Sequence, residues 1–225
     1  MENNRVLIID LQCFANVDWY KKVYSYYNVE MFIYERHKKM SFRNRILIAG
    51  GNGIMNLSVP LLDARNEKLL YNDIKIADEP WQRDHWRGIV SAYNRSPWFE
   101  YFRDDLAGIF EKHYRFLLDF NIDALHWVQS KLKLPVTFDL SPAHPVPAPA
   151  LRKAGGDPGN ADDFRNHFLP ASRSEWTSGK DAVGMYGQVF RDRHGFIPGL
   201  SILDLLFCEG PAAVQWLRTI EEPGK

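Results

Sequence analysis

The spacing of hydrophobic and polar positions changes several times along the chain, and each change predicts a new element. Residues 6–10 form a short apolar run that ends in a carboxylate, which is typical of a strand buried on both faces. Residues 17–27 carry apolar side chains at helical spacing on one side, and residues 29–34 again favour a strand. The pattern predicts an N-terminal β-α-β unit whose two strands are parallel and joined by a right-handed crossover.

The following segment has the pattern of antiparallel strands. Residues 46–49 and 54–59 flank a Gly-Gly-Asn-Gly turn, in which Asn-Gly supplies the positive φ angles of a tight hairpin. Residues 70–77, with Ile74 and Ile76 alternating, predict a further strand of this part. Because parallel and antiparallel strands both occur, we expect the sheet to be mixed.

A helical segment of about fifty residues is predicted to begin at Trp81. Ser96-Pro97 divides it, because a residue before proline leaves the α region, serine can cap a new helix and proline fits its first turn. Residues 136–140 alternate as another strand. Residues 141–181 are rich in proline and glycine and are interpreted as one irregular excursion. Beyond them we expect a strand at 186–190, a helix at 201–207 and a last amphipathic turn at 212–218.

These elements predict one domain that spans residues 1–225, a length that suits a single core. The fold class is α/β with α+β character. It combines a mixed β-sheet, an N-terminal β-α-β unit, an antiparallel hairpin part and a long central helical segment.

Composition and charge exclude several classes of function. The 28 Lys and Arg residues balance 28 Asp and Glu, which argues against a general nucleic-acid binder. No apolar run approaches the ~20 residues of a membrane span, and the N-terminus has too few apolar residues for a signal peptide. Cys13 and Cys208 lie far apart, without a cysteine-histidine cluster. We therefore expect no metal site and a cytoplasmic location, and the sequence indicates no particular cofactor.

A basic segment at residues 36–45 is the first candidate for binding. It holds five Lys or Arg residues and one His within ten positions, in a chain without net charge. One interpretation is a solvated loop kept soluble by lysine. The other is an anion-binding loop in which Arg43 and Arg45 hold a phosphate or carboxylate. In an extended segment these two arginines share one face, and Asn44 points to the other.

The first long helix supplies the second candidate. Trp81, His85, Ile89 and Tyr93 stand four apart and form one stripe. His85 suits general acid–base work at neutral pH, but a buried structural imidazole explains it as well. Asp204 could orient such a histidine, although with Ser201 it also forms a capping pair for the helix at 201–207.

Gln12, just past the first predicted strand, could bind a ligand amide or hydroxyl, or simply bond to the backbone of its own loop. The chain lacks the familiar nucleophile, phosphate-loop, dinucleotide and zinc-protease motifs. The predicted ligand-binding residues are Gln12, Arg43, Asn44, Arg45, Trp81, Tyr93 and Tyr186, and the predicted catalytic residues are His85 and Asp204.

Three blocks of the sequence resemble the WbqC-like family of bacterial proteins. The first is residues 42–46 followed by Leu-Ser-Val-Pro at 57–60. The second is Trp81-x-x-x-His85-Trp86 followed by residues 92–101. The third is Tyr-x-Gln-Val-Phe at 186–190 with residues 194–207. In order and spacing the resemblance covers nearly the whole chain outside residues 141–181.

Some members of that family are associated with O-antigen and other surface-polysaccharide gene clusters. The resemblance therefore implies a cytoplasmic step on a sugar nucleotide or a related precursor. The chain departs from the family pattern at residues 13–19, where many relatives carry a proline-rich aromatic run, and at Cys208, where many have asparagine. If those prolines shape the pocket, this member binds a different ligand.

Two hypotheses follow. In the first, the protein is an enzyme of polysaccharide-precursor metabolism, such as a group transferase. Arg43 and Arg45 hold a small anionic ligand, Trp81 and Tyr93 stack on it, and His85 moves a proton. In the second, it is a non-catalytic interaction protein that uses the basic loop and the aromatic stripe as a partner surface. Oligomer formation is compatible with both.

Overall fold

A four-stranded parallel sheet forms one side of the protein. The computed structural model describes residues 5–63, 66, 68–141, 161–171, 173–174 and 185–218. Its sheet contains β1 (Val6–Ile8), β2 (Asn28–Phe32), β5 (Thr137–Ser141) and β6 (Ala161–Asp163) in the order β5-β2-β1-β6, and every neighbouring pair is parallel. Helix α1 (Val17–Tyr24) connects β1 to β2. The predicted N-terminal β-α-β unit is thus confirmed.

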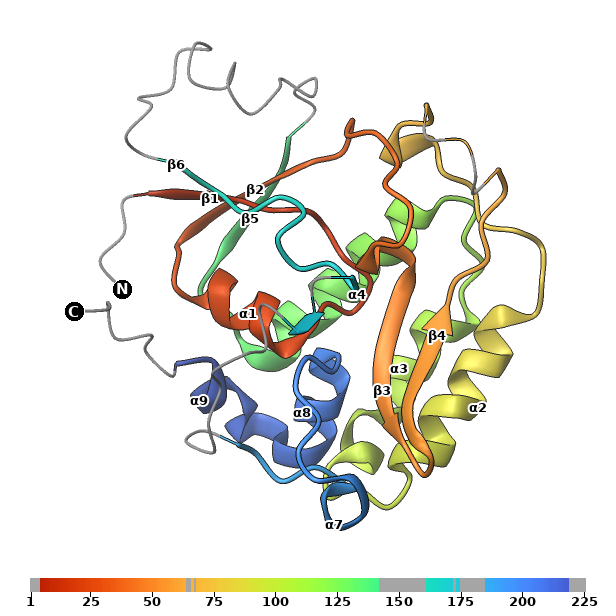
Figure 1. The fold of residues 1–225 in the computed structure, drawn as a ribbon, viewed down its shortest axis with the longest axis vertical. Helices are drawn as coiled ribbons and strands as arrows, with labels where there is room; N and C mark the ends of the chain where they lie inside the picture. The colour runs from red at the N-terminus through yellow and green to blue at the C-terminus, as the bar shows by residue number, and fades with distance from the viewer. Residues whose placement is uncertain are drawn as a thin grey trace.

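The strand order reverses between β1 and β6. From β1 the chain adds β2 and then β5 on one side, and β6 afterwards pairs with the other side of β1. Figure 1 shows the chain leaving the carboxyl ends of β1 and β6 toward the middle of the molecule. In open parallel sheets, ligands bind outside the carboxyl ends of the strands at such a reversal.

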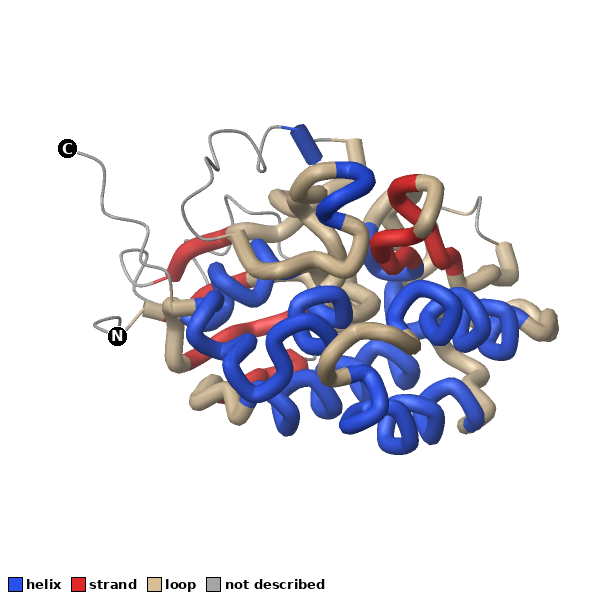
Figure 2. The backbone as a smooth tube through the Cα atoms, turned by 90° about the horizontal axis from the view of Figure 1, so that it is seen from below, coloured by secondary structure: helices blue, strands red, loops and turns tan. Residues whose placement is uncertain are grey.

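The predicted hairpin is present. Strands β3 (Arg45–Gly50) and β4 (Gly53–Ser58) pair antiparallel, and Gly53 at the turn has a φ of 108°. The expected mixture of parallel and antiparallel pairing is confirmed, but it is divided between two separate sheets. Figure 2 shows these as two groups of strands, with the helices gathered along one side of the molecule.

Three helices form the predicted central segment: α2 (Trp81–Tyr93), α3 (Phe99–Glu111) and α4 (Leu117–Leu132). The division at Ser96-Pro97 is confirmed, although the Ser96 hydroxyl donates to the carbonyl of Tyr93 and thus closes α2. A second break, at residues 112–116, was not predicted. There the Ile76 N–H donates to the Arg115 carbonyl at 3.0 Å, so the backbone between α3 and α4 pairs with another segment.

The C-terminal part consists of short helices: α7 (Arg191–His194), α8 (Ile202–Glu209), a 3₁₀ turn at Gly210–Ala212, and α9 (Ala213–Leu217). Helix α8 is buried along its length except at Glu209, and it contacts α3, α1 and β3. It thereby joins the parallel sheet's helix, the central helices and the hairpin into one hydrophobic core. No helix within the described ranges is long and apolar enough to cross a membrane.

Three predicted elements were wrong. Residues 70–77 contain a 3₁₀ turn, Tyr71–Asp73, and pair with other segments only through isolated bridges, so they do not extend the hairpin. Residues 186–190 form no strand, because the Gln188 side chain takes both backbone hydrogen bonds of Ile197 that a neighbouring strand would need. The excursion at 141–181 contains β6. Its residues 142–160, 172 and 175–181 lie outside the described part.

Candidate functional site

The strand reversal carries a buried carboxylate. Asp10 follows β1, and its Oδ1 accepts the backbone N–H of Asn166 at 2.9 Å from the segment after β6. Its Oδ2 accepts Nε2 of Gln12 at 2.9 Å. The same Nε2 donates to the Phe168 carbonyl at 3.1 Å. Asp10 and Gln12 thus tie the loop after β1 to the segment after β6.

A second group of charges lies beyond β2. Glu35 accepts Arg165 Nη1 at 3.2 Å on one oxygen and pairs with Arg43 Nη2 through the other. Arg165 also binds Asp163 through its Nη2 at 2.6 Å. Burial by itself would raise the pKa of the Asp163 carboxyl, but the hydrogen bonds from Arg165 outweigh this and lower it. The two arginines and two carboxylates therefore form one ion-pair chain across the sheet edge.

Arg43 is the most unusual member of this chain. It lies in the 3₁₀ turn Phe42–Asn44, where Ser41 caps the turn by accepting the Arg43 N–H. Its guanidinium lies 4.7 Å from the centre of the Tyr71 ring and is only 2% exposed. Its Nε and Nη1 have no hydrogen-bond partner among the described residues. Arginine N–H groups this deeply buried are normally satisfied, so the two open donors are unusual.

The extended geometry expected for Arg43 and Arg45 is wrong. The short 3₁₀ turn rotates Arg43 into the interior, whereas Arg45 begins β3 and remains partly exposed, with its Nη2 3.1 Å from the sulfur of Met40. Asn44 between them donates to the Val59 carbonyl at 3.0 Å and fixes the start of the hairpin. The three residues therefore face three different environments.

Several residues of the site were not predicted from the sequence, namely Glu35, Tyr71, Asn121 and Arg165. Asn121, on α4, is fully buried and its Nδ2 donates to the Arg43 carbonyl at 2.7 Å and to the Tyr71 hydroxyl at 2.5 Å. Burial raises the pKa of Tyr71, so its hydroxyl is neutral and can accept and donate. The available signal for Asn121 was an amide on the apolar stripe of α4, four positions after Leu117 and three before Ala124.

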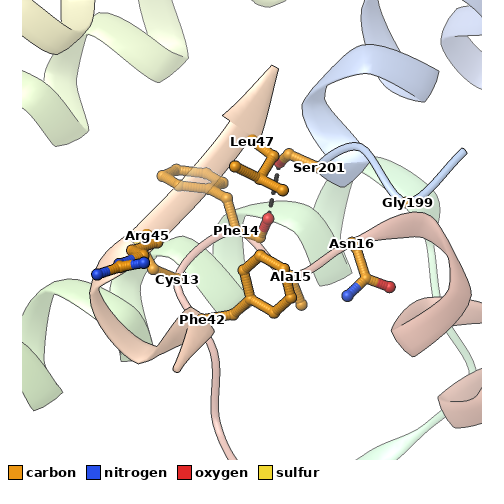
Figure 3. A pocket seen from close by; sticks show the side chains of 9 residues that line it. All are labelled: Cys13, Phe14, Ala15, Asn16, Phe42, Arg45, Leu47, Gly199 and Ser201. Atoms are coloured by element: carbon orange, nitrogen blue, oxygen red, sulfur yellow. Dashed lines mark hydrogen bonds between the residues drawn. The ribbon is translucent and has the colours of Figure 1, made fainter. Parts of the chain in front are cut away.

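A narrow crevice lies beside this cluster (Figure 3). Its walls are Cys13, Phe14, Ala15, Asn16, Phe42, Arg45, Leu47, Gly199 and Ser201. The Ser201 hydroxyl donates to the Phe14 carbonyl at 2.7 Å across it, and Phe14 has a positive φ of 38°. A positive φ is strained for an aromatic residue, and such strain is found where surrounding contacts hold a loop in a set shape. The crevice leaves no space for a water molecule.

His85 lies in the aromatic core. The centre of its ring lies 5.0 Å from that of Trp81 and 6.4 Å from that of Phe110. The imidazole also donates a hydrogen bond to the Ser58 carbonyl. Burial lowers the pKa of His85 to about 4, so the imidazole is neutral at pH 7. None of its contacts with described residues involves Arg43 or Arg45. Trp81 is likewise buried, against Phe120. The proton-transfer role of His85 and the stacking role of Trp81 stay predictions.

Three other predicted residues do meet. The buried carboxylate of Asp204 accepts the hydroxyls of Tyr93 and Tyr186, each at 2.6 Å. Tyr93 also accepts the Ala49 N–H at 3.1 Å, and Tyr186 accepts Nε2 of Gln188 at 3.1 Å. Asp204 therefore joins α2, α8, β3 and residues 186–188, rather than orienting His85. The capping prediction was half right, because Ser201 caps α8 but the Asp204 side chain does not take part.

The sheet order and the buried polar residues define an α/β protein with a buried polar cluster at its strand reversal. A family model described as the WbqC-like protein family matches residues 20–153, and the chain belongs to this family. Neither the search of curated proteins nor that of solved structures found a match. Of the cluster, the matched range includes Glu35, Arg43, Tyr71 and Asn121. Among the described residues, no group of three or more His, Cys, Asp or Glu could hold a metal ion.

Proposed function

We propose that this protein is an enzyme that binds a small anionic precursor, of the sugar-nucleotide kind, at the carboxyl edge of its parallel sheet. The reaction is transfer of a group to or from that precursor in the synthesis of bacterial surface polysaccharide. Membership of the WbqC-like family supports the biological setting, because some members are associated with O-antigen gene clusters. The strand reversal between β1 and β6 supports the location.

The observation that carries the proposal is the pair of open donors on Arg43. A buried polar group without a partner costs roughly 1–3 kcal/mol, and more when it is charged. A phosphate or carboxylate oxygen would satisfy Nε and Nη1 together, since the planar guanidinium presents its N–H groups as a fork. Glu35 and the Tyr71 ring hold that fork in place from the other sides.

The aromatic part of the earlier hypothesis receives less support. Trp81 and Tyr93 are buried in the core, so neither offers a free face to a ligand or to a partner protein. The proposal therefore rests on Arg43 and does not depend on His85. The alternative of a non-catalytic partner surface loses most of its aromatic stripe for the same reason.

Isothermal titration calorimetry with a panel of sugar nucleotides tests the proposal. We expect saturable binding by the wild-type protein and a loss of affinity of roughly tenfold or more in Arg43→Lys. Lysine keeps the positive charge beside Glu35 but lacks the planar, two-pronged guanidinium. The matched control is Arg103→Lys, because Arg103 is exposed on α3 and pairs with Glu100. Absence of binding to every sugar nucleotide, or equal affinity of the two variants, would overturn the proposal.

A further inference from the structure

Two buried amide oxygens also lack hydrogen-bond partners within the part of the chain that the structure describes. They are Oε1 of Gln12, which is 3% exposed, and Oδ1 of Asn121, which is 0% exposed. Both belong to the network that surrounds Arg43. Asn121 binds the Arg43 carbonyl directly, and Gln12 binds Asp10, which holds the segment that carries Arg165. The edge therefore presents open acceptors as well as the open donors of Arg43.

The orientation of the Gln12 amide follows from its neighbours. The nitrogen and oxygen of an amide look alike, so the assignment must come from the hydrogen-bond network. The Nε2 end faces a carboxylate oxygen of Asp10 and the carbonyl of Phe168, which both only accept. Turning the amide over would place Oε1 against these two acceptors. The open atom of Gln12 is therefore the acceptor Oε1.

The same reasoning applies to Asn121. Its Nδ2 end faces the Arg43 carbonyl, which can only accept. It also faces the Tyr71 hydroxyl, whose own proton has the Leu11 carbonyl 3.5 Å away as an acceptor. A reversed amide would oppose two carbonyl oxygens at 2.7 Å, which is repulsive. The open atom of Asn121 is therefore the acceptor Oδ1.

We propose that the ligand bound at this edge is an anion that carries its own hydrogen-bond donors, hydroxyl or amine groups, next to its charged group. Arg43 binds the anionic oxygen, and Gln12 and Asn121 accept from the donors, so these two residues determine specificity. An anion without donors leaves both amide oxygens unpaired in the buried site. This inference rests on the proposed function and deepens it, because it describes the part of the ligand beside the phosphate.

Three small phosphates test this inference on the wild-type protein. Glycerol 3-phosphate and propyl phosphate have the same chain length and charge but differ by two hydroxyls. We expect glycerol 3-phosphate to bind at least roughly tenfold more tightly in calorimetry, since a site built around hydroxyls discriminates against the analogue that lacks them. Phosphoethanolamine, which carries an ammonium donor instead, distinguishes an amine ligand from a hydroxyl ligand. Preference for either donor-bearing phosphate over propyl phosphate supports the inference.

Variants show whether the two amides cause the preference. Gln12→Met and Asn121→Leu keep the approximate size of each side chain but remove its acceptor. The control is Gln215→Met, because Gln215 is an exposed residue of α9. We expect the affinity ratio of the preferred phosphate to propyl phosphate to fall severalfold in the first two variants only. If the two amides had only a structural role, their replacement would weaken the binding of both ligands equally and leave the affinity ratio unchanged.

The outcomes separate the two proposals. If sugar nucleotides bind and depend on Arg43, but all three phosphates bind equally or none binds, the inference about donors is wrong and the proposed function stands. An unchanged ratio in both Gln12→Met and Asn121→Leu overturns the assignment to these amides. If no sugar nucleotide binds at all, the proposed function fails first, and the phosphate series then shows whether the edge binds another donor-bearing anion.

Discussion

His85 should make the protein less stable as the pH falls, and the size of this effect follows from its burial. Burial lowers the pKa of the imidazole from 6.5 in the unfolded chain to about 4 in the folded protein. Between these values the unfolded state binds a proton that the folded state excludes. The contribution of His85 to the stability of the folded protein is therefore fully present above pH 6.5 and is lost as the pH falls toward 4. A gap of about 2.5 pH units corresponds to a loss of about 3 kcal/mol.

Urea denaturation of the wild type and of His85→Gln, measured from pH 7.5 to 4.5, tests this. Glutamine cannot titrate but keeps an N–H donor for the Ser58 carbonyl. We expect the wild type to lose about 2 kcal/mol more than the variant over the interval from pH 6.5 to 5. Taking the difference between the two proteins cancels the other titrating groups. His126→Gln is the matched control, because His126 is exposed on α4.

A wild type and His85→Gln with parallel pH profiles would refute the reasoning, as would an NMR titration that places the pKa of His85 near 6.5. Either result would mean that the imidazole reaches solvent, which a proton-transfer role requires. The measurement therefore decides between the two interpretations of His85 left open by the sequence.

Three further predictions concern stability. Gly210→Ala should destabilise the protein by roughly 2–5 kcal/mol in urea denaturation, because Gly210 has a φ of 54° and a Cβ there would lie 2.2 Å from the Trp98 ring. Gly108→Ala is its control and should stabilise the protein by about 0.5–1 kcal/mol, since Gly108 is exposed on α3 and nothing lies near its Cβ position. A loss of stability in Gly108→Ala would contradict the argument. Burial raises the pKa of Asp204, so the folded state binds the extra proton and stability rises on acidification. The stability difference between the wild type and Asp204→Asn should therefore shift in favour of the wild type as the pH falls from 7 toward 4. Tyr93→Phe should cost about 1–3 kcal/mol through the unpaired Asp204 oxygen, and unchanged stability would mean that water replaces the hydroxyl.

Local pattern was enough to predict most helices and strands. The apolar run ending at Asp10, the Asn-Gly turn of the hairpin and the stripe that ends at Tyr93 each correspond to an observed element. These predictions succeeded because periodicity and turn chemistry depend on neighbours in the chain. Strand β6 escaped notice because three residues, Ala-Asp-Asp, carry no apolar pattern and pair only because β1 offers a free edge.

The residues of the candidate site were predicted less completely than the fold. Arg43 and Gln12 were identified by their types and by their places after turns and strands. Asn121 and Glu35 were missed, because what makes them important is contact with Arg43 from far along the chain. Conversely, Trp81 and His85 share a stripe that suggested a ligand surface, but α3 and α4 cover that stripe with Phe110 and Phe120.

The amino-acid sequence by itself determined the class of fold, the family resemblance and the basic segment that holds Arg43. Those features depend on local spacing and residue type. Only the tertiary structure decided that Arg43 points inward, that polar atoms of Arg43, Gln12 and Asn121 are buried without a partner among the described residues, and that the strand order reverses between β1 and β6. The physical reason is that burial and hydrogen-bond satisfaction are properties of atoms brought together from distant segments, which a one-dimensional pattern does not contain.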